Sequence, residues 1–460
     1  MQLDPRDPET RIARLLDDGK FEFLIPRTDC GMVAVTGDIK GNKVIVFASD
    51  ATIKSGALGV EGSKVIVSAY KAAMSAQVPI IGIWHSGGAR LSDGVASLDA
   101  FGEVFQSMIS ASGHIPQLSL VLGPTAGGGA YGPALTDIVV LSPEGRIFVT
   151  GPEVVKSVTG EDIDMALLGG PEAHRKNSGL AHIIAPTEQE AIDDVRDLTA
   201  LFANHGVMNP DVADIDLSVF VPQSQVRTYE VHPLVDAILD KETEHIELLS
   251  MWAPNMTTII GRLGGATVGV LANNPAHIAG ILDAAAGEKA ARFVRTCDAF
   301  GIPLIVIADV QGFLPGAGQE WEGAVRRGAK LLHAFGEAVV PRVTLITRRA
   351  YGGAYVAMNS KALGATRVLA WPEAEVSVMG AVAAVRVLHR RILADLPAEQ
   401  RESMELELAA EHEKISGGVA RAVEIGAVDE IIDPAHTRSA LAKIIASTPH
   451  RRGAHGNIPL

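Results

Sequence analysis

The chain has 460 residues, of which 47% are hydrophobic and only 5% aromatic, and it contains 47 glycines. This length predicts two domains of about 200 residues each with ample cores, and the composition is typical of an α/β enzyme. The 40 basic and 54 acidic residues give a formal net charge of −14. Such a chain repels nucleic acids and anionic membranes overall, so neither class of partner is expected.

Only two cysteines are present, Cys30 and Cys297. They exclude a disulfide framework and a four-cysteine zinc site, and we expect two buried thiols in a cytoplasmic protein. No basic segment followed by an apolar one opens the chain, so no secretory signal is predicted. Residues 118–136 and 263–282 are uncharged over a membrane-spanning length. Prolines or an Asn-Asn-Pro turn interrupt both, and buried strands and turns are expected there instead.

The predicted elements begin with a helix at residues 8–18. Pro79–Trp84 is a short apolar run after a proline, which is typical of a buried parallel strand. A matching run, Pro303–Ala308, follows later in the chain, at the offset 303 − 79 = 224. Helical patterns around Asp99 and Lys330 are expected after the two strands.

A second pair of segments has the same spacing. Gly128–Tyr131 matches Gly352–Tyr355, since 352 − 128 = 224 again, and a third match joins Pro143–Gly151 to Pro372–Gly380. Repetition at a nearly constant offset indicates an internal duplication. Within each copy, the order of strand, glycine-rich turn and helix predicts a layered β-β-α architecture.

The duplication predicts two domains, residues 1–225 and 226–460. Between the copies, residues 209–225 are polar, contain prolines and are only weakly periodic, as expected of a linker running over the surface. Near the carboxyl end, the charged residues 397–414 are expected to form a helix whose charges face solvent.

The tetrad His85-Ser86-Gly87-Gly88 invites a serine-hydrolase interpretation. A nucleophile elbow requires glycine two residues before the serine, and Trp84 occupies that position. A turn after a strand is therefore the favoured interpretation. The 14 histidines show no His-Glu-x-x-His spacing, so no metal site is predicted.

Two glycine-rich stretches remain as candidates for chemistry, Gly123–Tyr131 and Ala350–Tyr355. Neither is a dinucleotide or P-loop signature. Each is expected to open a helix, where backbone N–H groups lack intrahelical partners and bind oxyanions. Glycines that merely permit a tight turn are the alternative, which a single cluster would favour. Repetition favours two oxyanion sites, with each donor worth about 3 kcal/mol.

At these residues the chain resembles the carboxyltransferase β subunit of actinobacterial-type acyl-CoA carboxylases, in the crotonase superfamily. The likeness covers nearly the whole chain, and its motifs are highly specific in combination. They are Ser86–Leu91, Gly123–Asp137, Trp252–Asn255, Gly312–Gly316, Arg327–Leu332, Ala350–Met358 and Asn457–Leu460. The resemblance implies an α/β fold of two tandem crotonase-like domains, each a ββα superhelix, with acyl-CoA on the amino-terminal side and biotin on the carboxy-terminal side.

The resemblance also implies roles for the glycine pairs. Gly127 and Gly128 are expected to hold the acyl-CoA thioester carbonyl, and Gly353 and Ala354 the ureido oxygen of biotin. Carboxybiotin then releases CO2 in a closed site, its ureido nitrogen removes the acyl α-proton, and the enolate attacks CO2. Because Gly129 follows as a third glycine, the register of the first pair is open by one residue.

The turn after the first strand supplies the candidates for contact with CoA, namely Gly87, Gly88, Ala89 and Arg90. Glycines permit close approach of the ligand to the backbone, and Arg90 offers a partner for a phosphate group. An ordinary structural ion pair is the equally supported interpretation of Arg90.

Gly129, Tyr131 and Val356 complete the expected substrate-binding set. Propionyl-preferring relatives resemble one another in carrying Asp at the position of Val356, so an aliphatic residue here favours acetyl-CoA. That preference is weak, because one methylene in a pocket changes binding by only about 1–3 kcal/mol. Gln311, where relatives usually carry Pro, leaves the shape of the loop before Gly312 open.

The expected partners also follow from the resemblance. Biotin would arrive on a separate biotinylated, biotin-carboxylating α subunit, since the chain has no Met-Lys-Met motif and no ATP-binding loop. A homodimer is the expected minimum and a hexamer the usual state, with malonyl-CoA formation feeding fatty-acid synthesis and no metal required. A biotin-dependent decarboxylase subunit and a non-catalytic scaffold of the same fold are the alternatives.

Overall fold

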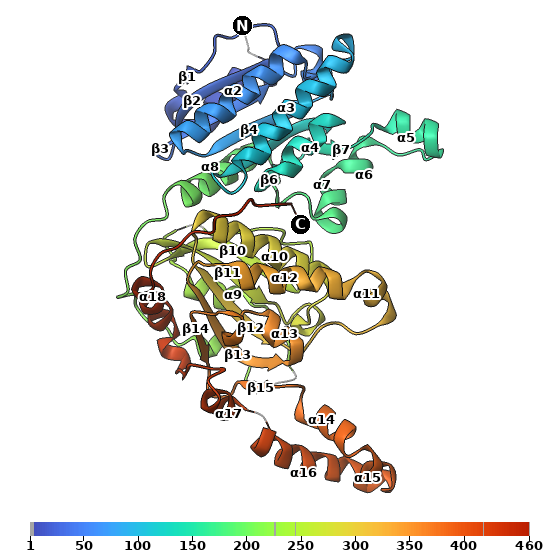
Figure 1. Cartoon of the computed structure of the whole chain (residues 1–460), viewed down its shortest axis with the longest axis vertical. Coiled ribbons are helices and arrows are strands. Elements are labelled where there is room, and N and C mark those ends of the chain that lie inside the picture. The colour runs from blue at the N-terminus through green and yellow to red at the C-terminus, as the bar shows by residue number, and fades with distance from the viewer. Residues whose placement is uncertain (1–3, 225–226, 244, 417, 460) are drawn as a thin grey trace. The chain divides into compact units, whose positions relative to one another are not determined.

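The computed structural model describes residues 4–224, 227–243, 245–416 and 418–459. The chain forms two compact units (Figure 1). Unit 1 comprises the described parts of Met1–His205, Ile246–Trp252 and Ala454–Leu460, and unit 2 those of Gly206–His245 and Ala253–Gly453.

Unit 1 is built on a mixed sheet in the order β1-β2-β3-β4-β5-β6-β8, with β7 paired to β5 outside this path. The first three strands are antiparallel and the remaining pairs are parallel. The strands of the unit are β1 (Phe21–Phe23), β2 (Met32–Ile39), β3 (Asn42–Ser49), β4 (Ile80–Ser86), β5 (Gln117–Ala126), β6 (Ile138–Leu141), β7 (Arg146–Phe148) and β8 (Ile183–Ile184). A short strand, β9 (Ile246–Glu247), lies in the returning segment.

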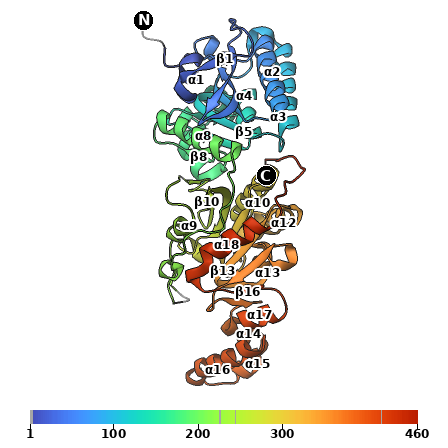
Figure 2. The ribbon, with the colours of Figure 1, turned by 90° about the vertical axis from the view of Figure 1, so that its left-hand side faces the viewer.

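Helices cover both faces of this sheet. Figure 2 shows α2 and α3 on one side and α1 and α8 on the other. The helices are α1 (Pro8–Leu15), α2 (Val60–Ala76), α3 (Val95–Ala111), α4 (Gly128–Leu135), α5 (Pro152–Thr159), α6 (Met165–Gly169), α7 (Pro171–Ala173) and α8 (Glu188–Ala203). The helices predicted near the amino terminus and around Asp99 are confirmed as α1 and α3.

Unit 2 repeats this plan. Its strands follow the order β16-β14-β13-β12-β11-β10, with β15 paired to β13, and α10 and α12 lie side by side in Figure 1. The strands are β10 (Met256–Leu263), β11 (Ala266–Asn273), β12 (Leu304–Val310), β13 (Arg342–Tyr351), β14 (Arg367–Ala370), β15 (Glu375–Ser377) and β16 (Glu430–Ile431). The helices are α9 (His232–Ile238), α10 (Ala284–Phe300), α11 (Ala317–Trp321), α12 (Ala324–Glu337), α13 (Gly352–Ala357), α14 (Ala381–Leu388), α15 (Arg390–Ala394), α16 (Ala398–Ser416), α17 (Val419–Glu424) and α18 (Thr437–Ser447).

The predicted duplication is confirmed down to an irregularity shared by the two sheets. The β4–β5 register shifts between Trp84 and Ser86, and the β12–β13 register shifts at the corresponding place, between Ala308 and Val310. The partner strands β5 and β13 begin at an offset of 342 − 117 = 225. The strands β4 and β12 begin at 304 − 80 = 224, so the second copy contains one additional residue between its two strands.

This extra residue corrects the alignment of the second glycine turn. Gly127 and Gly352 both have positive φ, +58° and +59°, and both follow the last residue of the matched strands. Gly127 is therefore the structural counterpart of Gly352, and Gly128 is the counterpart of Gly353. The sequence alignment of Gly128 with Gly352 was wrong by one position, because similar glycines stand next to each other.

Each unit has its own apolar core, formed where helices pack on the sheet. Phe47, Tyr70 and Trp84 are among the large side chains buried in the core of unit 1. Cys30 and Cys297 are both buried free thiols, as predicted. Burial raises the pKa of the Cys297 thiol strongly, so this thiol stays protonated and inert.

The expected domain boundary, residues 225 and 226, lies outside the described residues. The contacts divide the chain earlier, after His205, and the segment that follows packs into unit 2 through the buried Leu217. Two segments return to unit 1. Leu249 N–H donates to the His182 carbonyl at 2.7 Å, and the Asn457 side-chain amide donates to the Asp137 carboxylate at 2.7 Å.

The charged helix predicted at residues 397–414 is confirmed as α16. It packs with α14 and α15 around Val385, Leu393 and Ala409. Nowhere in the described chain is a helix long and apolar enough to cross a membrane.

Candidate active site

The first glycine turn joins β5 to α4. Gly127 adopts φ +58° between them, and its N–H donates to the Phe148 carbonyl of β7 at 3.2 Å. Since α4 begins at Gly128, the N–H groups of Gly128 and Gly129 precede the first intrahelical hydrogen bonds. These two donors, rather than that of Gly127, are the ones that the helix start offers to a ligand.

A second turn lies against this helix start. A Cβ placed on Gly88, which has φ +92°, would lie 3.1 Å from the Ala126 carbonyl oxygen and 4.0 Å from Gly127 Cα. Leu58 holds the turn in place. Its N–H donates to the Gly88 carbonyl at 2.9 Å, and its carbonyl accepts from Arg90 N–H at 2.8 Å. In a parallel bridge of this kind, the N–H of the central residue faces away from its partner, so Ala89 N–H is directed away from Leu58.

Ser86 is a buried support for both turns. Its Oγ accepts a hydrogen bond from Gly88 N–H at 3.2 Å, and a Cβ on Gly129 would lie only 3.2 Å from the same oxygen. The residue is 3% exposed. A serine occupied in this way is not presented to a substrate, which supports the rejection of a hydrolase.

Arg90 is anchored to the fold rather than to a carboxylate. Its Nη2 donates to the Cys30 carbonyl at 2.7 Å and to the Ala57 carbonyl at 3.4 Å. These contacts join the turn to the loops that precede β2 and α2. The guanidinium therefore has a structural role in unit 1, whatever else it binds.

Unit 2 repeats both turns. Gly352, with φ +59°, follows β13 and opens α13, and a Cβ on the exposed Gly353 would meet nothing within 4 Å. The loop after β12 forms the second turn. Leu282 N–H donates to the Gly312 carbonyl at 3.0 Å, and Leu314 N–H donates to the Leu282 carbonyl at 2.7 Å.

Phe313 is a further candidate site residue, which sequence reasoning missed. Phe313 bridges to Leu282 as Ala89 bridges to Leu58, and both residues of this bridge keep the offset of the first pair of strands. The signal that would have found Phe313 is the same repeat offset applied to the loop after the strand. Phe313 is 36% exposed to solvent.

The structural register also pairs two predicted substrate-binding residues. Tyr131 and Val356 are counterparts, since 356 − 131 = 225 matches the offset of β5 and β13. Both project from the exposed side of their helices, with 51% and 40% of their surface accessible. Ala354 is buried beside Tyr355, whose hydroxyl donates to the Ala427 carbonyl at 3.1 Å. Burial raises the pKa of Tyr355, and nearby Asp429 adds to this effect, so its phenol remains neutral.

The chemistry of both turns is that of backbone N–H groups. Among the residues that the structure describes, no group of three or more His, Cys, Asp or Glu side chains is arranged to hold a metal ion. Paired N–H groups beside glycines stabilise a developing oxyanion in place and without reorganisation. The two units thus present two equivalent turns whose helix-start N–H groups are candidate oxyanion donors.

Comparisons with known proteins agree with this geometry. A family model described as the carboxyl transferase domain matches residues 15–455. The chain is 58% identical to the biotin-dependent acetyl-/propionyl-coenzyme A carboxylase beta6 subunit of Mycobacterium tuberculosis, over 100% of this chain and 98% of that protein. It is 51% identical to the propionyl-CoA carboxylase beta chain of Rhodococcus erythropolis, over 99% and 97% of the two chains.

The likeness extends to the three-dimensional fold of a solved structure. The transcarboxylase 12S core, described as a hexamer with methylmalonyl-coenzyme A bound, superposes with a TM-score of 0.91 at 35% identity, over 99% of this chain and 92% of that one. The chain therefore belongs to the carboxyl transferase domain family. The predictions of tandem crotonase-like domains and of a carboxyltransferase subunit of the biotin-dependent acyl-CoA carboxylase type are confirmed.

Proposed function

We propose that this chain moves the carboxyl group of carboxybiotin, carried on a separate subunit, to acetyl-CoA and propionyl-CoA. The observation that carries the proposal is the pair of equivalent glycine turns, one in each unit. The reaction has two anions to stabilise, the acyl-CoA enolate and the biotin ureido anion. Acetyl-CoA and propionyl-CoA are proposed as the acceptors because the related proteins are described as acetyl-/propionyl-CoA carboxylase subunits.

We assign the acyl-CoA thioester oxygen to the turn of unit 1. The family resemblance points to Gly127 and Gly128, but Gly127 N–H already donates to the Phe148 carbonyl. Gly128 and Gly129 carry the N–H groups that α4 leaves without intrahelical partners. The shifted register also makes them the counterparts of Gly353 and Ala354, so we propose Gly128 and Gly129 as the donor pair.

We assign the biotin ureido oxygen to Gly353 and Ala354 in unit 2. Carboxybiotin supplies the carboxyl group and, after its release, the ureido nitrogen that accepts the α-proton. The open space over Gly353 suits close approach of a planar ureido group to the backbone. Backbone dipoles then hold negative charge on both reactants, which explains why the mechanism needs no side-chain base.

The side chains around the two turns set binding and preference. We propose that Gly87, Gly88 and Ala89 line the path of CoA, since the glycines permit close approach of the ligand. Arg90 then acts mainly by holding this turn, because its Nη2 is bonded to two backbone carbonyls. We further propose that Tyr131 and Val356, at equivalent exposed positions, contact the two substrates.

The assembly proposed for this chain is an oligomer of the β subunit with a biotinylated biotin-carboxylase α subunit. The transcarboxylase 12S relative is described as a hexamer, and that state is proposed here together with a role in lipid synthesis. The chain's own contribution is then the transfer half of the reaction.

ATP-dependent fixation of labelled bicarbonate by the reconstituted complex tests this function. We expect labelled product from acetyl-CoA and propionyl-CoA, and less from butyryl-CoA. A scaffold would bind the α subunit without turnover. A decarboxylase subunit would release CO2 from the carboxylated thioester instead of fixing it. Absence of fixation with a demonstrably biotinylated partner contradicts the proposal.

A further inference from the structure

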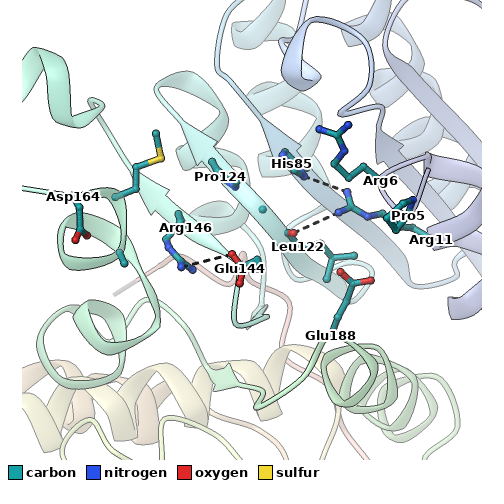
Figure 3. A pocket seen from close by; sticks show the side chains of 13 residues that line it. Pro5, Arg6, Arg11, His85, Leu122, Pro124, Glu144, Arg146, Asp164 and Glu188 are labelled. Atoms are coloured by element: carbon teal, nitrogen blue, oxygen red, sulfur yellow. Dashed lines mark hydrogen bonds and ion pairs between the residues drawn. The ribbon is translucent and has the colours of Figure 1, made fainter.

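Unit 1 contains a pocket of about 560 Å³ between α1, the ends of β4 and β5, and the loops near α6 and α8 (Figure 3). Arg6, Arg11, His85 and Arg146 line it together with three carboxylates. Successive side chains of a strand point to opposite faces, so His85 lies on the other side of β4 from Ser86. The pocket is therefore separate from the glycine turn that Ser86 supports.

Arg11 is a buried cation without a counter-ion. It is 3% exposed, yet among residues 4–224, 227–243, 245–416 and 418–459 no carboxylate lies within 4 Å of its guanidinium. Its Nη1 approaches His85 Nδ1 at 3.4 Å, and its Nη2 approaches the Leu122 carbonyl at 3.5 Å. Its Nε is buried and has no hydrogen-bond partner in the described part of the chain. Burial lowers the pKa of Arg11, the direction expected for a charge removed from water.

The carboxylates of the lining do not neutralise Arg11. Glu188 attracts Arg11 at longer range but is paired with Arg14. Asp164 caps α6, with its Oδ1 accepting from Leu167 N–H at 2.8 Å. Glu144 is largely exposed and lies 4.0 Å from Arg146. Arg6, at the rim, is paired with Asp4.

In unit 2 the position equivalent to His85 holds a carboxylate, so the fold supplies its own counter-ion there. His85 and Asp309 occupy the equivalent place at the register shift of β4 and β12. In unit 2 the buried Asp309 carboxylate accepts from Arg348 Nε at 2.8 Å and from Arg349 Nε at 3.0 Å. The counterpart of Arg348 in unit 1 is Gly123, since 348 − 225 = 123 at the offset of β5 and β13.

Two substitutions between the copies change the charges at this position. Gly123 stands in place of Arg348, and the His85 ring fills the space beside it, since a Cβ on Gly123 would lie 2.3 Å from His85 Nδ1. His85 replaces the carboxylate, and α1 brings in Arg11 from outside the repeat. Burial, with a contribution from Arg11 and Arg6, lowers the pKa of His85 to about 4, so the ring is neutral near pH 7. A buried cation facing a neutral ring and a cavity retains the cost of its desolvation.

We propose that this pocket of unit 1 binds a small oxyanion, a carboxylate or a phosphate group, which supplies the counter-charge that the Arg11 guanidinium lacks in the described chain, as Asp309 supplies it for Arg348 in unit 2. Charge-assisted hydrogen bonds of this kind are short and strong. His85 is adjacent to Ser86, so occupancy is expected to stiffen the end of β4.

Thermal unfolding of the full chain with inorganic phosphate or acetate, at ionic strength matched with sodium chloride, tests the proposal without any assay of activity. At about ten times the dissociation constant, a bound anion stabilises by about 1.4 kcal/mol, which raises the wild-type midpoint by about 2–4 °C. A response to phosphate alone or to acetate alone identifies the ligand class. Absence of any response to either anion overturns the proposal.

Two variants make the test specific. His85→Asp copies the arrangement of unit 2, and it is expected to raise the midpoint without added anion and to abolish the response. Arg11→Gln removes the charge and is also expected to abolish the response. Titration calorimetry with the same anions gives the second readout. An equal response in wild type and in either folded variant overturns the proposal. It leaves the carboxyltransferase function untouched, since that function is measured separately.

Discussion

The two units share a topology, a register shift and two glycine turns, yet they differ on both sides of the sheet. In unit 1 the helix start is packed, with Gly128 against the Phe101 ring, and the opposite face holds a pocket lined by Arg11, which is unpaired within the described chain. In unit 2 the turn at Gly353 is open, and on the opposite face the Asp309 carboxylate pairs with Arg348 and Arg349. The two copies thus share the backbone of the glycine turns, while their side chains differ around these turns and on the opposite face.

Removing the carboxylate of Asp309 is expected to have the largest effect. Asp309→Asn leaves Arg348 and Arg349 buried without a counter-charge, which costs about 3–5 kcal/mol of unfolding free energy. His85→Asn at the equivalent position removes no charge at pH 7 and is expected to cost less than about 1 kcal/mol. Urea unfolding of both variants measures the difference. Equal losses would show that the two faces are not differentiated as described.

The second-largest effect is expected from blocking the open turn of unit 2. Gly353→Pro removes one N–H donor at a helix start, where proline is tolerated, and lowers the rate of carboxyl transfer about 100-fold, equivalent to about 3 kcal/mol. Gly353→Ala is the matched control. It keeps the N–H, and its Cβ meets nothing within 4 Å, so near-normal transfer is expected. Full activity of a folded Gly353→Pro protein would place the biotin site elsewhere.

The free energy of unfolding should depend more strongly on acid pH in unit 1 than in unit 2, because of His85. Its pKa is about 4 in the folded chain and 6.5 in the unfolded chain, mainly because burial disfavours the charged ring. The stability due to the neutral ring is therefore complete above pH 6.5 and is lost as the pH falls toward 4. Between pH 7 and 5 the wild type is expected to lose about 1–2 kcal/mol more than His85→Asn, with allowance for partial solvent screening of the ring. Parallel pH profiles of unfolding free energy for the two proteins would refute this.

A carboxylate at Val356 should have the smallest effect. Val356→Asp is expected to change the ratio of kcat/KM for propionyl-CoA over acetyl-CoA several-fold in favour of propionyl-CoA, about 1 kcal/mol. The position is 40% exposed, so the fold tolerates the change. Val356→Asn separates the effect of charge from that of shape. An unchanged ratio in Val356→Asp assigns acyl preference to other residues.

Local patterns in the sequence predicted much of this molecule. The proline-led strands at Pro79 and Pro303 and the two glycine turns are readable because their residues are neighbours in the chain. The one-residue shift between Gly127 and Gly352 was hidden, since a register irregularity depends on how two strands pair. The return of residues 246–252 and 454–459 to unit 1 was also hidden, because those contacts are long-range.

The pocket around Arg11 was missed for a related reason. Arg11 and His85 are far apart in sequence, and neither carries a motif. What distinguishes them is a missing counter-ion, which becomes visible only when the burial of one copy is compared with the ion pair of the other. Whether a buried charge has a partner depends on tertiary contacts. Composition and periodicity do not encode those contacts.

The most direct test of the central claim uses the isolated chain with carboxyl-labelled malonyl-CoA and free biotin, in the absence of ATP. If the two glycine turns hold the two anions, the chain alone moves label from the thioester to biotin, and Gly353→Pro lowers this transfer while leaving the dissociation constant of the thioester unchanged. No transfer by the folded wild type, or equal transfer by wild type and Gly353→Pro, would contradict the account.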